Sequence, residues 1–266
     1  MSVGGRSAPL GDTLSKLEHR FGELAAELAE LDDFLAPFLD RYRRDVLAPQ
    51  EALVNLRRRV ADARLLLGDR AAREAAEADT PLGRLLVNEA YPSVREQYER
   101  VWKGKQQPRA EDAFVEFRPA PLAPEVLALY TRVAAQLHPL LADDRAERER
   151  RKGLMAPVDW AYVRRDVISL HSVADAHARE SSLPALAGPE ADGAMQQRIS
   201  QLEKGIQRAE SRIYERRHGD AAKVLAYTLA AGRSGLDMLG ELNRMTVELI
   251  DAAERELSGL EARLKG

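Results

Sequence analysis

Two groups of residues have the types and spacing of metal ligands. Glu215-Arg216-Arg217-His218 is a Glu-x-x-His element, which di-iron helical bundles use twice, together with two further glutamates on facing helices. Only one copy is present here. His171 and Asp175 lie one helical turn apart with His177 nearby, a pattern that could form a weak metal site but is more typical of solvent-facing residues on an amphipathic helix. We therefore predict no metal site.

Other chemical motifs are missing from the sequence. It has no cysteine, and therefore no thiol nucleophile, thiolate metal site or disulfide. It has no glycine-rich phosphate loop ending in Lys-Ser or Lys-Thr, no Gly-x-Ser-x-Gly and no His-Glu-x-x-His. The five histidines are scattered along the chain. We therefore predict that the protein is not an enzyme, has no catalytic residues and uses no cofactor.

Arginine outnumbers lysine by 33 to 7, and many of the arginines are clustered. A guanidinium group binds phosphate or carboxylate through two parallel hydrogen bonds, so clusters aligned on one side of a helix are candidate nucleic-acid contacts. Acidic residues are interleaved with most clusters, and solvated faces with exposed ion pairs are the alternative. The candidate contacts are Arg41, Arg43, Arg44, Arg57, Arg58 and Arg59; further clusters lie at 148–152 and 164–165.

The overall composition favours helices. Alanine, leucine, arginine and glutamate dominate the 266 residues, while β-branched and aromatic residues are scarce. With 40 basic and 43 acidic side chains the net charge is -3, so nucleic-acid binding would need a local basic patch. No apolar run approaches the roughly 18 residues of a membrane-spanning helix, and no apolar signal-peptide segment follows Met1. We predict an all-α, cytoplasmic protein without membrane contact.

A long helix is expected near the N-terminus. Between residues 14 and 42 the apolar positions alternate spacings of three and four, as in the seam of a coiled coil. Residues 15–18 have the pattern of a capping box at its start. An extra step of four over residues 42–46 is a stutter, and Pro49 then removes a backbone donor. We predict a helix that starts near residue 12 and bends near Pro49.

A second coiled-coil segment is expected at the C-terminal end. Two apolar seams, at 199–213 and 236–264, are separated by His218-Gly219-Asp220, which can turn the chain. This predicts an antiparallel helical hairpin. Asn243 lies on the second seam, where a polar residue can fix the register, unless a register one position off places it at the surface. The sequence leaves open whether the arms pair within one chain or between two chains of a homodimer.

The middle of the chain lacks long apolar seams and contains helix-capping residues and prolines instead. Its first part has the signals of short helices followed by a proline-rich linker, in which Phe114, Val115 and Phe117 alternate with charges and could anchor on a neighbouring surface. A helical hairpin follows, with Tyr130, Trp160 and Tyr162 as expected core residues. The boundaries predicted for the whole chain are 1–11 (flexible), 12–70 (bent coiled-coil helix), 71–123 (short helices and linker), 124–180 (helical hairpin), 181–194 (loop) and 195–266 (C-terminal hairpin).

This middle hairpin resembles a J-domain. Residues 129–139, Leu-Tyr-Thr-Arg-Val-Ala-Ala-Gln-Leu-His-Pro, look like the family's second helix, which ends in a His-Pro-Asp signature. A charged loop at 143–151 and a helix with the pair Ala161-Tyr162 fall where the family has its loop and third helix. Pro157 should break or kink that helix, which the family pattern does not require. The arrangement is similar to a bacterial group of DnaJ-related proteins in which such a hairpin lies between two coiled-coil segments.

The resemblance implies an interaction with a DnaK-type chaperone, whose ATP hydrolysis the His-Pro-Asp motif and a basic face on the preceding helix would trigger. Here the motif reads His138, Pro139 and Leu140, and leucine cannot accept the hydrogen bonds expected of the aspartate. Arg132 is the only cation from Pro124 up to His138. We therefore predict a degenerate J-like module that has lost co-chaperone activity, in which His138 and Pro139 simply end a helix.

The preferred interpretation is a non-catalytic interaction or scaffold protein that binds a protein partner and forms a homodimer. A coiled-coil protein associated with DNA or RNA through its arginine clusters is the alternative, and an active J-domain co-chaperone is a second one. Fold similarity by itself does not decide among them.

Overall fold

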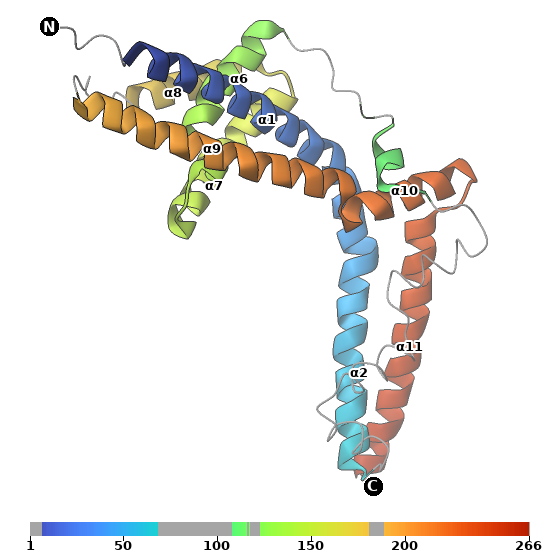
Figure 1. The fold of residues 1–266 in the computed structure, drawn as a ribbon. Helices are drawn as coiled ribbons and strands as arrows, with labels where there is room; N and C mark the ends of the chain where they lie inside the picture. The colour runs from blue at the N-terminus through green and yellow to red at the C-terminus, as the bar shows by residue number, and fades with distance from the viewer. Residues whose placement is uncertain (1–6, 69–107, 116, 118–122, 181–188, 266) are drawn as a thin grey trace, which may run out of the picture. The chain divides into compact units, whose positions relative to one another are not determined.

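The computed structural model describes residues 7–68, 108–115, 117, 123–180 and 189–265 (Figure 1). Within these ranges all regular secondary structure is helical, which confirms the all-α prediction. The chain divides into two compact units, one made of residues 1–35 and 116–219 and the other of residues 36–115 and 220–266. No helix in the described part combines the length and the apolar character needed to cross a membrane. Most of the predicted segment 71–123 lies outside the described residues.

The N-terminal helix α1 (Ser7–Tyr42) starts earlier than predicted. Pro9 lies in its first turn, where a missing backbone donor costs little, and the Thr13 hydroxyl donates a hydrogen bond of 2.8 Å to the Pro9 carbonyl. Ser15 is therefore inside the helix and does not cap it. The prediction of a flexible segment up to residue 11 is wrong for residues 7–11.

The predicted stutter coincides with a π-helical turn. Residues Arg43–Leu47 form this turn, and the N–H of Ala48 donates to the carbonyl of Arg43, one residue farther back than in an α-helix. Helix α2 (Ala48–Leu66) follows with Pro49 in its first turn. A regular α-helix would press the proline ring against the carbonyl of Asp45, and the wider turn relieves this crowding. The helix ends before Gly68, whose φ of 75° suits glycine.

Four further helices complete the first unit. They are α6 (Pro124–Leu137), α7 (Arg145–Val163), α8 (Val167–Glu180) and α9 (Pro189–His218), with a 3-10 turn at Pro139–Leu141 after α6. The predicted loop at 143–151 is wrong, because Asp144 caps α7 by accepting a 2.8 Å hydrogen bond from the N–H of Glu147. Glu147 also pairs with Arg150 and Arg151 one turn later. Pro157 lies within α7, which continues to Val163.

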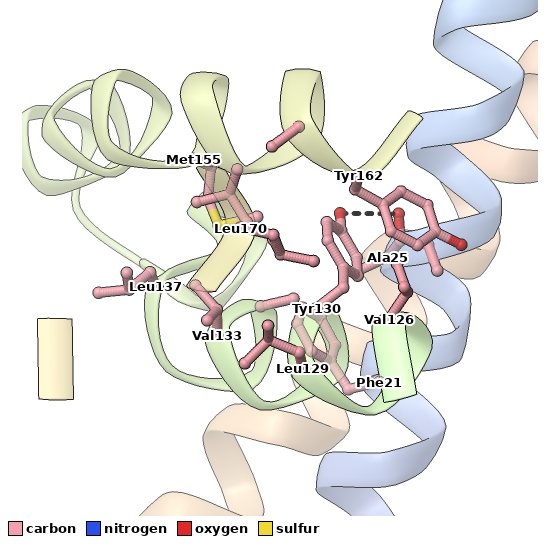
Figure 2. Packing of buried hydrophobic residues seen from close by; sticks show 14 of the residues in the cluster. Phe21, Ala25, Val126, Leu129, Tyr130, Val133, Leu137, Met155, Tyr162 and Leu170 are labelled. Carbon is pink, nitrogen blue, oxygen red and sulfur yellow. Dashed lines mark hydrogen bonds between the residues drawn. The ribbon is translucent and has the colours of Figure 1, made fainter. Parts of the chain in front are cut away.

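The core of the first unit lies between α1, α6, α7, α8 and α9, and Figure 2 shows part of it. Its largest fully buried side chains include Tyr130, Tyr162 and Phe21. The two tyrosine rings lie 4.1 Å apart between centroids. Phe117 packs on Phe34 of α1, with 5.0 Å between the ring centroids, so this part of the linker is anchored. Tyr130 and Tyr162 are thus core residues, as predicted.

Two glycines allow helices of the first unit to approach closely. A Cβ atom on Gly22 of α1 would lie 2.1 Å from Cγ2 and 2.8 Å from Cα of Thr131 on α6. A Cβ atom on Gly205 of α9 would lie 2.6 Å from Cδ2 of Leu141. All three distances are far below van der Waals contact. At Gly22 the backbone of Thr131 leaves no room for a side chain, whereas at Gly205 an alanine would require the end of the Leu141 side chain to shift.

The second unit contains α2, a 3-10 turn at Ala110–Phe114, α10 (Asp220–Arg233) and α11 (Met238–Lys265). The start of α11 packs near Val46, and its later part packs against α2 from Leu53 to Ala63. The two helices therefore run in the same direction, as Figure 1 also shows. In the first unit α1 and α9 are likewise parallel, since Arg20 pairs with Glu210 and Glu27 pairs with Arg217.

The predicted antiparallel hairpin over 195–266 is therefore wrong. Helix α9 belongs to the first unit, whereas α10 and α11 belong to the second, so the two predicted seams do not pair with each other. Each seam packs on a part of the N-terminal helix instead, within the same chain. The second seam uses Leu242 and Thr246, which leaves Asn243 half-buried beside it. Residues 189–194, predicted as loop, are the first residues of α9.

Candidate functional site

The His-Pro turn is built by the end of α6. His138 has an extended backbone (φ -60°, ψ 136°), and Pro139 cannot continue the helix, so α6 stops at Leu137. The Nδ1 atom of His138 accepts a 3.2 Å hydrogen bond from the N–H of Leu140 and so caps the 3-10 turn. Because Nδ1 of His138 accepts this hydrogen bond, the imidazole is the neutral tautomer that carries its proton on Nε2.

His138 is buried. Only 6% of the residue is exposed, and its ring meets the ring of Phe21 edge-on at 5.4 Å between centroids. Burial and, as a smaller cause, the positive charge of Arg151 together lower the pKa of His138 to about 4. The imidazole is therefore uncharged at neutral pH. A buried, neutral histidine with its Nδ1 already occupied is a structural group.

Four arginines from α7 and α9 hold the carbonyl groups at the end of α6 and in the turn. They are Arg198 on Ala135, Arg151 on Gln136, Arg208 on Leu140 and Ala142, and Arg148 on Ala142 and Asp143. The side chain of Asp143 also pairs with Arg208 and Lys204. Cations near the C-terminus of a helix interact favourably with its dipole. The arginines at 148 and 151 thus serve the fold of the turn.

A second polar group lies where α1, α6 and α7 meet. The hydroxyl of Tyr130 donates a 2.8 Å hydrogen bond to Asp159. It also lies 3.3 Å from the carbonyl of Ala25 (Figure 2). Burial raises the pKa of Asp159 to about 6; the hydrogen bond from Tyr130 opposes this rise, and the charge of Asp32 adds to it. This carboxyl group is therefore close to its titration point near neutral pH.

A neighbouring cluster joins α1 to the end of α7. The hydroxyl of Tyr162 donates 3.2 Å to Glu30, and Arg165 pairs with the same carboxylate at 3.1 Å. Burial raises the pKa of Tyr162, and the charge of Glu30 raises it further. Arg165 has φ of 60°, which is unusual for a residue other than glycine, and its guanidinium lies over the Tyr162 ring. These contacts fix the turn between α7 and α8.

Trp160 is not a core residue, contrary to the prediction. It is 52% exposed, and the guanidinium of Arg164 lies 4.9 Å from its ring centre. The buried face of α7 runs through Met155, Val158 and Tyr162, and Trp160 falls outside that face. The residue was assigned to the core because of its type, whereas helical periodicity from Met155 would have placed it at the surface.

Further apolar side chains are exposed just beyond Trp160. Val167 and Ile168 begin α8, and Ile168 is 84% exposed. We call Trp160, Arg164, Val167 and Ile168 the α7–α8 corner. This corner was not predicted, although Asp166 is a capping residue and is followed by two apolar residues, Val167 and Ile168, in the first turn of a helix.

The six arginines predicted as nucleic-acid contacts do not form a free basic stripe. Most pair with acids: Arg41 with Asp237 (2.6 and 2.7 Å) and Asp45, Arg44 with Asp45, Arg43 with Asp40, and Arg59 with Glu261. Arg57 is buried, with 7% of its surface exposed. Arg58 is exposed and has no ion pair within the described part of the chain. Phosphate binding by this set would therefore require breaking existing ion pairs.

The candidate metal ligands are not brought together. Among the described residues, no three histidine, aspartate or glutamate side chains gather into a possible metal site. His171 and Asp175 are exposed on α8, and the side chain of His177 lies outside the described residues. The Nδ1 atom of His218 lies 3.0 Å from the carbonyl of Tyr214, and the two rings stack. The single Glu-x-x-His element is thus part of an ordinary helix end.

Comparison of the chain with protein-family models, with curated proteins and with solved structures finds no match. No relative therefore supplies an activity, a partner or a set of functional residues. The resemblance to J-domains is a prediction that rests on the residues of 129–162 alone. The functional argument must accordingly be made from the site itself.

Proposed function

We propose that this chain is a non-catalytic interaction protein whose J-like module binds a protein partner through the α7–α8 corner. The observation that carries the proposal is the exposure of two large apolar side chains, Trp160 and Ile168, on helices that contribute to the core of the first unit. Tryptophan and arginine are the residue types that contribute most often to binding hot spots, and here Arg164 holds the indole ring from one side. A partner that covered these side chains would remove apolar surface from water.

The apolar seams offer less to a partner. The seam of α2 is buried against α11, and apolar residues of α1 and α9 contribute to the core of the first unit. A coiled-coil partner would have to displace a helix of the same chain. We propose a second copy of this chain as the partner, and the homodimer then forms through the α7–α8 corner instead of through the seams.

The buried His-Pro turn argues against co-chaperone activity. His138 is covered by Phe21, and the carbonyl groups of the turn are occupied by arginines of α7 and α9. A chaperone could reach the motif only after α1 and α9 had separated from α6. The proposed module therefore does not stimulate a DnaK-type ATPase. We do not propose DNA or RNA binding, because four of the six candidate arginines pair with carboxylates and Arg57 is buried.

The ATPase proposal is tested by adding the full chain to a DnaK-type chaperone, beside a Leu140→Asp variant that restores the aspartate of the motif. We expect neither protein to change the rate of ATP hydrolysis, because in both His138 is buried against Phe21 and arginines occupy the carbonyl groups of the turn. Stimulation by the unaltered chain would contradict the proposal. Stimulation by the variant alone would show that the turn is accessible and that Leu140 had silenced it.

The proposed interface is tested by light scattering coupled to size-exclusion chromatography. We expect the unaltered chain to have the mass of a dimer, and Ile168→Asp to have the mass of a monomer with an unchanged helical circular-dichroism spectrum. The matched control is Leu66→Asp, which introduces the same charge at another exposed apolar residue, in α2. This variant should remain a dimer. A monomeric wild type would contradict the homodimer, and a dimer that survives Ile168→Asp would contradict the corner.

A further inference from the structure

The first unit has an open cavity beside the buried turn. Its volume is about 490 Å³, within the range of roughly 300–1,000 Å³ typical of small-molecule sites. Helices α7 and α9 supply the charged and polar groups around it, which are Arg148, Arg208, Arg212, Glu215, Gln207 and Ser211. Leu140 provides an apolar wall. Three guanidinium groups and one carboxylate line the cavity, and the guanidinium of Arg208 is already paired with Asp143, so the charge balance of this group is positive by one.

Two of these arginines are held in place by the fold. Arg208 donates through Nη1 to the carbonyls of Leu140 and Ala142, and Arg148 donates through Nη2 to those of Ala142 and Asp143. Among the described residues, neither the Nε of Arg208 nor the Nε and Nη1 of Arg148 has a partner. These donors are preorganised, because the carbonyl contacts have already fixed the side chains.

Arg212 completes the set. It lies one turn after Arg208 on α9 and is exposed, and it makes no hydrogen bond or ion pair with the residues that the structure describes. Ser211 and Gln207 on the same helix add neutral donors. Glu215 lies one turn after Arg212, so along α9 the carboxylate follows the guanidinium groups of Arg208 and Arg212.

We propose that this cavity binds the phosphoryl group of a small organic phosphate. Phosphate oxygens accept several charge-assisted hydrogen bonds, and guanidinium groups match their geometry. Glu215 disfavours a ligand with negative charge at both ends and can accept a hydrogen bond from a hydroxyl group of the same ligand. The ligand class is therefore a phosphate monoester that carries hydroxyl groups. This inference does not depend on the α7–α8 corner.

The site is tested by isothermal titration calorimetry of the full chain with glycerol 3-phosphate and, separately, with inorganic phosphate at constant ionic strength. We expect saturable binding at one site and tighter binding of the ester. Arg212→Gln should weaken binding by about tenfold or more, because a hydrogen bond to a charged group is lost. Arg212 makes no contact that the fold requires, so this variant should stay folded.

Two further variants make the test specific. Arg132→Gln removes an exposed arginine of α6 that does not line this cavity, and it should leave the affinity unchanged. Leu140→Asp places a carboxylate against the arginines and should weaken binding without removing any of them. The proposal would be overturned by the absence of saturable binding, by an unchanged affinity in Arg212→Gln, or by glycerol 3-phosphate binding no tighter than inorganic phosphate.

Discussion

Asp159 is a partly buried residue whose charge state changes near pH 6 in the folded protein. Tyr130 from α6 donates to it, Asp32 from α1 faces it, and Asp32 in turn pairs with Arg216 of α9. Because burial raises its pKa to about 6 from an ordinary 3.8, the folded unit favours the protonated form. The stabilisation is fully present below pH 3.8 and is lost as the pH rises through about 6.

We therefore expect Asp159→Asn to be more stable than the wild type at pH 7, by about 2 kcal/mol after allowance for solvent screening. The asparagine cannot ionise and still accepts the hydrogen bond from Tyr130. The advantage should vanish near pH 4, where the wild-type carboxyl is also neutral. Chemical denaturation of both proteins at the two pH values measures the difference.

The control for this substitution is Asp175→Asn, on the exposed face of α8 in the same unit. It should change stability little at either pH. A difference between the wild type and Asp159→Asn that stays the same from pH 4 to pH 7 would show that Asp159 does not titrate in this window. His138 contributes in the opposite direction, since its lowered pKa makes the fold lose stability as the pH falls from 6.5 toward about 4.

At the scale of helices, close packing depends on glycine. In Gly22→Ala the new methyl group would meet both the side chain and the backbone of Thr131, so α1 and α6 must move apart. We expect a loss of about 2 kcal/mol or more, as for an overpacked core. Gly205→Ala should cost less, because the first atom it meets is a methyl group of the Leu141 side chain, which can shift.

Gly153→Ala on α7 is the matched control. A Cβ atom there meets nothing within 4 Å, and alanine is the better helix former by up to about 1 kcal/mol. This variant should therefore be slightly more stable than the wild type. Urea denaturation followed by circular dichroism compares the three variants. Equal effects at Gly22 and Gly153 would contradict the close approach of α1 and α6.

Helix-level features were predictable where local chemistry decides them. The stutter over residues 42–46 marked the place where the helix departs from regular α geometry, although it did not predict a π-helical turn, and His138-Pro139 indicated the end of α6. The start of α7 was missed, although Asp144 followed by Glu147 is a capping pattern. The candidate sites were not predictable from the sequence, because the exposure of Trp160 and the cavity lined by α7 and α9 depend on tertiary packing.

The direction of helix pairing could not be read from the seams. A heptad pattern specifies that an apolar stripe will be covered, but it does not specify which helix covers it or in which direction. The short turn at His218-Gly219-Asp220 suggested reversal. In the structure the chain instead passes there from one unit to the other, and the long stretch between α2 and α9 makes parallel pairing possible.

At the scale of the whole molecule, each unit is built from two segments that lie far apart in the sequence. The first unit pairs α1 with α9, and the second pairs α2 with α11. The buried residues of the two units form separate clusters, while helix α1 runs across the boundary between residues 35 and 36. Separate cores would let each unit unfold independently of the other, whereas the shared helix α1 would make the two units unfold together.

These alternatives are distinguished by hydrogen exchange of two cavity-forming variants. Leu257→Ala removes a buried side chain between α2 and α11, and Leu170→Ala removes one from the core of the first unit. Each should cost about 2–5 kcal/mol in its own unit. We expect Leu257→Ala to speed exchange in α2 and α11 but not in α6, α7 and α8, and Leu170→Ala to do the reverse. Faster exchange throughout both units in either variant would show that the continuous helix makes the two cores unfold together.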